Sequence, residues 1–251
     1  MKTIAVTNYK GGVGKTTSVA NLGHALADAG RRVLLVDLDP QASLTLSLGL
    51  DPDELPSVYG ALAGEDLLAD LIHDRPPFHV LTAEHTMTGA DIVLSRQEGF
   101  AYLLKEALKP VSRRYDVCLI DCQPTMGVLP VNALTAADLV LIPISADYLA
   151  ARGTRDLLGL IDQARGAYNK RLKIGGVFVT QLDTRTVLGR QVSEAVHGEL
   201  EGQAFQTAIR KNVTLAEAPA RGQTVFEYDR NSHGAADYAA LAGELVERWK
   251  I

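Results

Sequence analysis

Several features that narrow the class of a protein are missing from this 251-residue chain. No apolar run approaches the roughly 18 residues that are needed to cross a bilayer, and the first residues show no signal-peptide pattern. Only two cysteines occur, Cys118 and Cys122, and they flank one apolar run, so neither a disulfide framework nor a zinc site is indicated. These absences argue against a membrane-spanning or disulfide-stabilised protein and fit a reducing cytoplasm.

An excess of basic residues is also missing. The net charge is −5, which argues against a surface that is basic all round and coats nucleic acid. The charge is uneven, however. Residues 1–151 hold 11 Lys and Arg against 18 Asp and Glu, a net of −7, whereas residues 152–232 hold 12 against 9, a net of +3. A weak basic face in the C-terminal part is therefore expected.

Apolar strands alternate with helical patterns along the chain. Continuous apolar runs such as Val33–Val36 are typical of strands that are buried on both faces. The expected strands are Thr3–Thr7, Val33–Val36, Phe78–Thr82, Asp116–Asp121, Leu139–Ile144, Gly176–Thr180 and a short one at Ala204–Ile209. The expected helices run from the loop after the first strand to Ala29, then over Val58–Ala63, Leu67–Ile72, Phe100–Leu108, Leu149–Tyr168, Val187–Leu200 and His233–Trp249. This order predicts an α/β fold, a doubly wound and mainly parallel twisted sheet flanked by helices, in a single domain over residues 1–251.

The stretch Lys10–Thr17 (KGGVGKTT) lies between a strand and a helix, the context of a phosphate-binding loop. Its glycines let several backbone N–H groups point at one anion, and the helix dipole adds to the positive field. Lys15 would reach the β- and γ-phosphates, and the Thr16 hydroxyl would ligate Mg²⁺. The residues predicted to hold the nucleotide here are Gly11, Gly12, Val13, Gly14, Lys15, Thr16 and Thr17.

The strict P-loop pattern fails at one position, because Tyr9 stands where it requires glycine. In exchange the loop holds a second lysine, Lys10. Since Lys15 already serves the phosphates, Lys10 is expected to point outward and could reach a nucleotide on a second subunit. Two such loops face to face would make a symmetric dimer in which each Lys10 neutralises charge at the partner's γ-phosphate.

Carboxylates follow two of the expected strands. Asp37 and Asp39 come directly after Val33–Val36, and Pro40 disfavours helix at Asp39, so both lie in a turn at the edge of the sheet where ligands bind. One of the two can serve the metal, for which we predict Asp37, while Asp39 orients the attacking water. Asp121 ends its strand in the form of the second nucleotide-binding motif, whose Asp holds Mg²⁺ through water.

A later strand contributes polar groups to the same edge. Gln181 and Asp183 follow Gly176–Thr180, and an amide or carboxylate there is well placed for the base of the nucleotide. The predicted metal ligands are Thr16, Asp37 and Asp121, and the predicted catalytic residues are Lys10, Lys15 and Asp39.

With these motifs the whole chain resembles the ParA/Soj family of DNA-partitioning ATPases, in the deviant Walker A group that also includes MinD. The matching stretches are Lys10–Thr17 (KGGVGKTT), Val36–Gln41 (VDLDPQ), Tyr115–Asp121 (YDVCLID), Asp183–Thr186 (DTRT) and Asn212–Pro219 (NVTLAEAP). The short N-terminus without a helix-turn-helix extension resembles the small ParA subtype.

The resemblance implies a cycle. ATP with Mg²⁺ would drive formation of a nucleotide-sandwich homodimer, the dimer would bind double-stranded DNA without sequence preference, and a ParB-like, centromere-bound partner would stimulate an otherwise slow hydrolysis that releases the DNA. Lys10 would then be the lysine that acts in trans, Asp39 the water-orienting residue, and the protein would be cytoplasmic and nucleoid-associated, with no membrane partner.

The match is imperfect at three places. Tyr9 replaces the usual Gln, Cys122–Thr125 (CQPT) replaces Cys-Pro-Pro-Ser, and Ile209–Asn212 (IRKN) replaces Ile-Pro-Arg-Asn. The last change puts lysine where relatives carry a DNA-contacting arginine, which keeps the charge but loses bidentate phosphate contact. The candidates for DNA contact are Arg185, Arg190, Arg210, Lys211 and Arg221.

Three alternatives remain open at this point. A MinD-like membrane-cycling ATPase needs a basic amphipathic tail, whereas the segment Gly243–Ile251 is short and carries two Glu. An iron-protein type of electron-transfer ATPase needs cysteines on loops at the dimer axis, whereas Cys118 lies within an apolar strand. A scaffold that positions another cargo would use the same ATP cycle, and its sequence would look the same.

Overall fold

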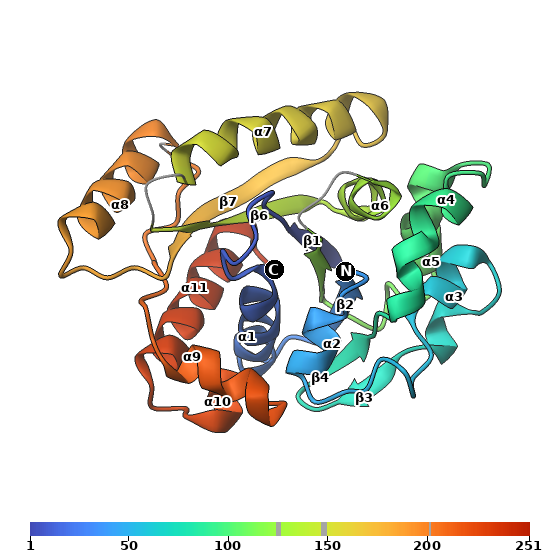
Figure 1. The fold of residues 1–251 in the computed structure, drawn as a ribbon, viewed down its shortest axis with the longest axis horizontal. Coiled ribbons are helices and arrows are strands. Elements are labelled where there is room, and N and C mark those ends of the chain that lie inside the picture. Colours follow the sequence, from blue (N-terminus) through green and yellow to red (C-terminus); the bar gives the residue numbers. More distant parts are fainter. Residues whose placement is uncertain (124–126, 147–149, 201) are drawn as a thin grey trace.

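A computed structural model describes residues 1–123, 127–146, 150–200 and 202–251. Within these ranges seven strands form one sheet in the order β3-β4-β2-β5-β1-β6-β7 (Figure 1), and only the pair β3–β4 is antiparallel. The predicted mainly parallel α/β fold is therefore confirmed, whereas the assignment of residues 1–251 to a single domain stays a prediction. The strands are β1 (Lys2–Val6), β2 (Val33–Leu38), β3 (His73–Arg75), β4 (Phe78–Leu81), β5 (Val117–Cys122), β6 (Leu139–Ser145) and β7 (Lys173–Thr180).

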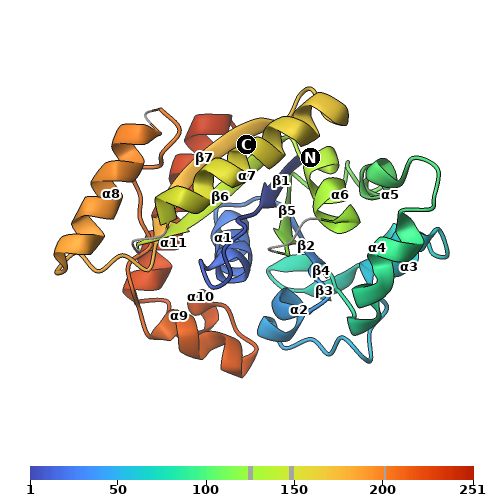
Figure 2. The same cartoon turned by 45° about the horizontal axis from the view of Figure 1, so that its top comes forward.

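Helices cover both faces of the sheet (Figures 1 and 2), and alternate residues of each central strand pack into two separate cores. In β2, Leu34 and Val36 belong to the core under α5, α6 and α7, whereas Val33 and Leu35 belong to the core under α1 and α11. This explains why the central strands read as unbroken apolar runs. The main helices are α1 (Lys15–Asp28), α5 (Leu103–Leu108), α6 (Val128–Ala136), α7 (Ala150–Ala167), α8 (Val187–Glu199) and α11 (His233–Trp249).

Short helices connect these elements, and none of the described helices is long and apolar enough to cross a bilayer. They are α2 (Ser43–Ser47), α3 (Val58–Ala63), α4 (Ala90–Leu94), α9 (Thr214–Glu217) and α10 (Val225–Tyr228), with 3₁₀ turns η1 (Leu68–Asp70), η2 (His85–Gly89), η3 (Phe100–Tyr102) and η4 (Ala218–Arg221).

The predicted strand over Ala204–Ile209 is wrong. An isolated bridge joins Ala204 to Val177 of β7, and a second one joins Arg210, just after the segment, to Leu182, just after β7, so no continuous ladder forms. Between the bridges the N–H groups of residues 206 and 207 donate to the carboxylate of Glu244 on α11, at 2.9 and 3.0 Å, instead of to a neighbouring strand. A side chain from a distant helix therefore takes the hydrogen bonds that a ladder would need.

Two further differences concern helices. The predicted helix over Leu67–Ile72 is wrong, because only the 3₁₀ turn Leu68–Asp70 forms before the chain enters the antiparallel edge strand β3. Conversely, α6 was not predicted from the sequence. Its residues are apolar nearly all round and mostly buried, so the helical periodicity that reveals an amphipathic helix is missing. Leu149, the predicted start of α7, lies outside the described residues.

Candidate nucleotide-binding site

The loop between β1 and α1 is held by side chains from the end of β7. The Thr180 hydroxyl donates to the backbone carbonyl of Val13 at 2.8 Å, and Gln181 Nε2 donates to the carbonyl of Gly12 at 2.6 Å. Gln181 has a φ of +54°, a left-handed conformation that is uncommon outside glycine. The predicted base-reading residue Gln181 thus lies against the phosphate loop, and the loop is shaped by a strand that follows it by more than 160 residues.

Within the loop, Gly14 has a φ of +85° and forms the N-cap of α1, so the turn into the helix requires a left-handed residue. Gly11 and Gly12 are exposed, which leaves their backbone open to a ligand, whereas the Val13 side chain is buried in the protein. Val13 can therefore contact a phosphate only through its backbone N–H. This arrangement of a glycine-rich loop at a helix N-terminus suits an anion.

Lys15 starts α1, and its side chain is nearly buried, at 8% exposure. Its ammonium nitrogen donates to the backbone carbonyl of Lys10 at 3.2 Å. Burial lowers the pKa of Lys15, and the neighbouring Asp121 carboxylate opposes that shift. A partly desolvated ammonium group inside the loop is well suited to bind a phosphate, because the negative charge of the phosphate would stabilise the ammonium that burial destabilises. Lys10 itself is half-buried, and its N–H donates to the Asn8 side chain at 3.1 Å.

The predicted metal ligands Thr16 and Asp121 lie together. The Thr16 hydroxyl donates to Asp121 Oδ2 at 2.6 Å, across 105 residues of sequence. Asp121 is 1% exposed, and among the described residues its other oxygen, Oδ1, has no hydrogen-bond partner. Burial and the nearby Asp37 raise the pKa of Asp121 well above its ordinary value. An orphaned carboxylate oxygen next to a hydroxyl is a donor set that a hydrated Mg²⁺ can use.

The small number of protein donors fits Mg²⁺ better than an ion that is bound by protein groups alone. No group of three or more His, Cys, Asp or Glu that could hold a metal occurs among the described residues. Mg²⁺ is commonly held by one or two protein groups together with waters and substrate phosphates, so a small donor set fits it. The cysteines are poor candidates for metal ligands. Cys118 and Cys122 are both free and buried within β5, where burial raises the pKa of each thiol and so disfavours the thiolate that a metal needs.

Asp37 lies opposite Asp121 in the register of β2 and β5, but its oxygens face other groups. Oδ2 accepts hydrogen bonds from the backbone N–H and the hydroxyl of Thr45, at 2.9 and 2.8 Å, and Oδ1 accepts one from the N–H of Asp39 at 3.2 Å. Asp37 is fully buried, and burial raises its pKa to about 6. These bonds give Asp37 a part in shaping the turn after β2, and its predicted contact with a metal stays a prediction.

Asp39, by contrast, is half-buried at the surface of the site. Its Oδ1 accepts a hydrogen bond from the N–H of Gln41 at 2.9 Å, and its backbone carbonyl accepts one from Ala42. The charge of Asp39 slightly opposes the lowering of the Lys15 pKa by burial and adds slightly to the raised pKa of Asp121, so the carboxylate lies near the loop lysine and the end of β5. It therefore stands beside the site that the P-loop defines, as a water-orienting residue must.

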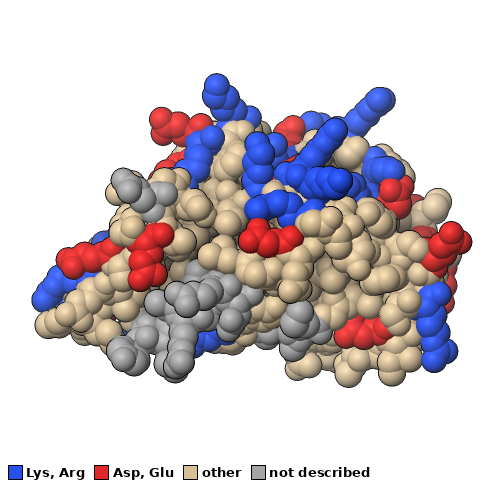
Figure 3. All heavy atoms as spheres, turned by 90° about the horizontal axis from the view of Figure 1, so that it is seen from above, with Lys and Arg blue, Asp and Glu red and all other residues tan. Residues whose placement is uncertain are grey.

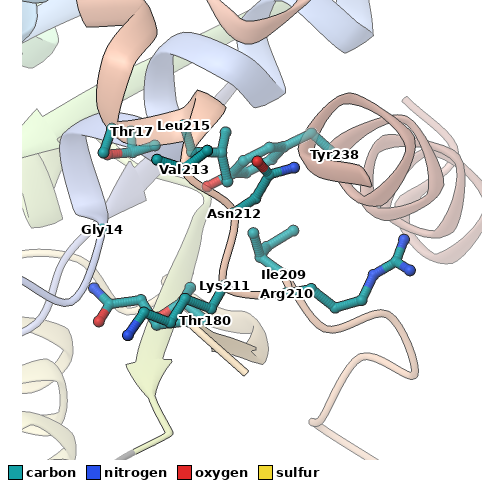
Figure 4. Close-up of a pocket in the computed structure, with 12 residues that line it drawn as sticks. Gly14, Thr17, Thr180, Ile209, Arg210, Lys211, Asn212, Val213, Leu215 and Tyr238 are labelled. Atoms are coloured by element: carbon teal, nitrogen blue, oxygen red, sulfur yellow. The ribbon is translucent and has the colours of Figure 1, made fainter. Parts of the chain in front are cut away.

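A cavity of about 390 Å³ adjoins the loop, which is a usual size for a small-molecule site (Figure 4). Its lining includes Gly14 and Thr17 from the loop and the start of α1, together with residues 209–213, 215 and 216. The Asn212 side chain is fixed within that segment, because its Oδ1 accepts hydrogen bonds from the N–H and hydroxyl of Thr214 at 2.9 and 2.7 Å. The cavity places a predominantly apolar surface beside the phosphate loop, where the nucleoside part of a nucleotide would lie.

Some residues of this cavity were not predicted as site residues from the sequence, among them Asn212, Leu215 and Tyr238. The available signal was the stretch Asn212–Pro219, which marks the family but does not by its spacing reveal a pocket. Tyr238 comes from α11, and its hydroxyl lies 3.0 Å from that of Ser18, so the last helix also supports the site. Asp183, which was predicted to bind the nucleotide, does not line the cavity.

Asp183 instead pairs with a predicted DNA contact. Its two oxygens accept hydrogen bonds from Nε and Nη2 of Arg185 at 2.9 and 2.8 Å. These bonds lower the pKa of Asp183 to about 2, with a smaller contribution from Lys211. The Arg185 side chain is still 88% exposed, so it stays accessible to a large ligand.

The other basic candidates are spread over three elements. Arg190 on α8 is exposed and donates to the carbonyl of Thr184 at 3.0 Å, and Arg221 is exposed at the end of η4. Arg210 and Lys211 run in opposite directions (Figure 4), and Arg210 is held by several hydrogen bonds from its backbone and guanidinium group to Asp237. The structure thus brings together a nucleotide site. Bonds between residues 182–184 and their neighbours also place Arg185, Arg190, Arg210 and Lys211 on adjoining segments. The role of the five basic residues in DNA contact stays a prediction.

The stretch Cys122–Thr125, which begins at the last residue of β5, is described only in part. Cys122 and Gln123 are described, and Pro124 and Thr125 lie outside the described residues. The departure of this stretch from the usual Cys-Pro-Pro-Ser therefore has no structural account.

Comparisons with known proteins agree with this geometry. A family model described as an AAA domain matches residues 1–174. The chain is 42% identical over 248 residues to the sporulation initiation inhibitor protein Soj of Bacillus subtilis, covering 98% of each chain. It is 39% identical over 248 residues to the chromosome partitioning protein ParA of Myxococcus xanthus, covering 98% of this chain and 88% of that one.

Solved structures of nucleotide-binding proteins also share the fold of this chain. A structure described as cobyrinic acid a,c-diamide synthase of Mycobacterium smegmatis with a bound ATP analogue and magnesium has a TM-score of 0.88 and 38% sequence identity, covering 100% of this chain and 96% of that one. The cell division ATPase MinD of Pyrococcus furiosus has a TM-score of 0.81 and 26% identity, covering 98% of each chain.

Proposed function

The chain belongs to the ParA/Soj family of chromosome-partitioning ATPases, and we propose that it binds ATP with Mg²⁺ and hydrolyses the γ-phosphate to drive DNA segregation. The observation that carries this proposal is the joint position of Lys15 inside the phosphate loop and the Thr16–Asp121 pair next to it. These groups sit at the carboxyl edge of the sheet, beside a cavity large enough for a nucleoside.

Each residue around the loop takes a role that its surroundings allow. Lys15 binds the β- and γ-phosphates and exchanges its bond to the Lys10 carbonyl for bonds to phosphate oxygens. Thr16 and Asp121 would hold Mg²⁺, since the Thr16 hydroxyl lies beside the Asp121 carboxylate, whose Oδ1 has no hydrogen-bond partner among the described residues. When bound, the ion supplies charge neutralisation between the phosphates. Because phosphoryl transfer depends mainly on positioning and charge, no covalent step on the protein is needed.

Asp39 orients the attacking water in this proposal. Its carboxylate is half-buried, stands beside Lys15 and Asp121, and lies in a turn that Asp37 and Thr45 hold in place. Removal of Asp39 should therefore affect hydrolysis more than binding.

We further propose that ATP drives dimerisation and that Lys10 acts in trans. Lys10 is half-buried and directly precedes the exposed Gly11 and Gly12 at the carboxyl edge, where a second subunit can approach. An ammonium group supplied across the dimer would neutralise charge on the γ-phosphate in the way an arginine finger does. The loop of one subunit would then contact the ATP that is bound to the other subunit.

The ATP-bound dimer would bind duplex DNA without sequence preference, through Arg185, Arg190, Arg210, Lys211 and Arg221, and associate with the nucleoid in the cytoplasm. A ParB-like partner would accelerate hydrolysis and release the DNA. The C-terminal helix favours DNA over a bilayer as the surface on which the protein cycles. Leu241 and Leu245 of α11 are buried, and Trp249 Nε1 donates to the Gly175 carbonyl at 2.7 Å, so the apolar face of α11 already covers the sheet.

The test uses the purified full chain. Analytical ultracentrifugation with ATP and Mg²⁺, with ADP and without nucleotide should show a dimer only with ATP, and phosphate release should be slow and rise in the presence of a centromere-bound partner. A chain that stays monomeric with ATP, or that releases no phosphate, would contradict the proposal.

A further inference from the structure

The edge of the sheet opposite the nucleotide site carries a concentration of basic residues. Here the parallel strands begin, and the segments 1–3, 29–33, 111–117, 137–139 and 168–174 meet side by side through bonds such as Lys2 N–H to the Asp116 carbonyl and Lys173 N–H to the Asp138 carbonyl. We call these segments the amino edge. Its basic residues are Lys2, Arg31, Arg32, Arg113, Arg114, Lys170, Arg171 and Lys173.

Only two acidic residues, Asp116 and Asp138, accompany these eight cations, so the amino edge has a net charge of +6 in a chain of net −5. Six of the eight cations are exposed, and Lys2 and Arg31 are half-buried. Figure 3 shows Lys and Arg side chains gathered on one part of the surface, where they outnumber the acidic side chains around them. The patch was invisible in the sequence, because its members come from four separate stretches that only the strand order brings together.

The acidic residues of the amino edge neutralise little of its positive charge. Asp116 pairs with Arg32 at 2.8 Å, and this contact lowers the pKa of Asp116 to about 2. Asp138 accepts a hydrogen bond from the N–H of Thr3 at 2.9 Å. Among the described residues, no ion pair involves any of the other seven cations of the amino edge.

The dimensions of the amino edge fit an extended polyanion. From β2 to β7 there are four steps between neighbouring strands, which at about 4.8 Å each span about 19 Å. Duplex DNA carries one charge per about 1.7 Å of its axis, so a stretch of that length presents on the order of ten phosphates. None of the large, exposed apolar side chains lies in the five segments of the amino edge, so the surface offers charge without the apolar anchors that favour insertion into a bilayer.

We propose that the amino edge is a second binding surface, which holds the phosphate backbone of duplex DNA in a manner that does not depend on nucleotide. The choice of DNA as the polyanion rests on the proposed function. The amino edge lies about 17 Å from the phosphate loop, the length of the five-residue strand β1 at about 3.3 Å per residue. It therefore stays accessible when a second subunit covers the carboxyl edge, and one chain could contact DNA on both sides.

The experiment measures retention of a fluorescent, sequence-unrelated duplex by the full chain, over a series of salt concentrations, with ATP, with ADP and without nucleotide. The charge reversals Arg113→Glu and Arg171→Glu, which come from two different loops of the amino edge, are compared with Arg96→Glu. Arg96 is an exposed arginine outside the amino edge, so Arg96→Glu makes the same change in net charge.

We expect weak binding by the unaltered chain without nucleotide, and a severalfold loss in each amino-edge variant with a salt slope that is smaller by about one per phosphate contact removed. Asp138→Asn, which keeps an oxygen to accept the Thr3 N–H bond, should strengthen the same binding. The Asp138→Asn variant also keeps the test informative if a charge-reversal variant fails to fold. Arg96→Glu should change the DNA binding little.

The results separate this inference from the proposed function. Amino-edge variants that bind DNA as well as Arg96→Glu does, or an unaltered chain that binds no DNA without nucleotide, would overturn the inference alone. Loss of the additional binding that ATP brings would instead contradict the proposed function. Binding to phosphatidylglycerol vesicles that the amino-edge variants abolish, with DNA binding unchanged, would overturn the inference in favour of a bilayer.

Discussion

The side-chain nitrogen of Lys15 donates to the backbone carbonyl oxygen of Lys10, 3.2 Å away, so the two lysines of the phosphate loop are joined by one hydrogen bond. A phosphate that enters the loop competes for the same ammonium group. We therefore expect nucleotide binding to break the bond between Lys15 and the Lys10 carbonyl, next to the proposed trans lysine. In the proposed function, this contact would link nucleotide binding to dimerisation within six residues of chain.

Lys15→Ala should weaken ATP binding strongly. The variant removes a charge-assisted bond to phosphate, worth about 1.5–3 kcal/mol, which corresponds to a loss in affinity of roughly 10- to 150-fold. Isothermal titration with ATP and Mg²⁺ measures the change, with Lys2→Ala as a control at the far end of β1. Unchanged affinity for ATP in Lys15→Ala would remove Lys15 from the nucleotide site.

Asp39→Ala should leave ATP-dependent dimers that hydrolyse ATP slowly. The carboxylate orients water rather than binding phosphate, so we expect a fall in kcat of about 10²-fold or more with little change in ATP affinity. Phosphate release and sedimentation measured on the same sample separate the two effects. Asp53→Ala, at an exposed acid away from the site, is the control. Normal turnover in Asp39→Ala would exclude the residue from the chemistry.

Arg185→Glu should reduce the DNA binding that depends on ATP while leaving dimerisation intact. Arg185 is 88% exposed although it pairs with Asp183, so a phosphate can share its guanidinium group. We expect weaker binding to all sequences and a salt slope that is smaller by about one. Retention that stays as strong as in Arg96→Glu at low salt would show that Arg185 has no part in DNA binding.

Asp116→Asn should lower stability slightly at neutral pH, by less than about 1 kcal/mol, because the ion pair with Arg32 is largely exposed to solvent. The pKa of Asp116 is lowered to about 2, so its contribution is complete above the ordinary value near 3.8 and is lost as the pH falls toward 2. Urea unfolding of the unaltered chain and of Asp116→Asn should give free energies of unfolding that differ at pH 7 and converge near pH 2. A difference that persists at pH 2 would show that the contribution does not come from the carboxylate charge.

The motifs that could be predicted from the sequence are the ones made by neighbouring residues. The phosphate loop follows from Lys10–Thr17, and the strand that carries Asp121 follows from its apolar run, because each is a local pattern with a local cause. The direction of Asp37 could not be predicted, since it depends on Thr45 from the next helix. The pairing of Asp183 with Arg185 involves near neighbours, yet only the turn geometry decides that they face each other.

The features that escaped prediction depend on contacts over long distances in sequence. Glu244 on α11 takes the backbone N–H groups of residues 206 and 207, which prevents the strand predicted there. The helix α6 is buried nearly all round and shows no polar face. The amino edge is assembled by the order of the strands, which a linear pattern of charges does not contain.

The central claim is that the loop holding Lys15 and Lys10 converts ATP binding into a DNA-binding dimer. The measurement that tests it most directly is DNA retention by the unaltered chain and by Lys10→Ala, each with ATP, with ADP and without nucleotide. We predict that ATP alone increases retention by the unaltered chain, and that Lys10→Ala binds ATP with unchanged affinity but shows no such increase. Equal retention in all three nucleotide states, or an undiminished response in Lys10→Ala, would contradict the account.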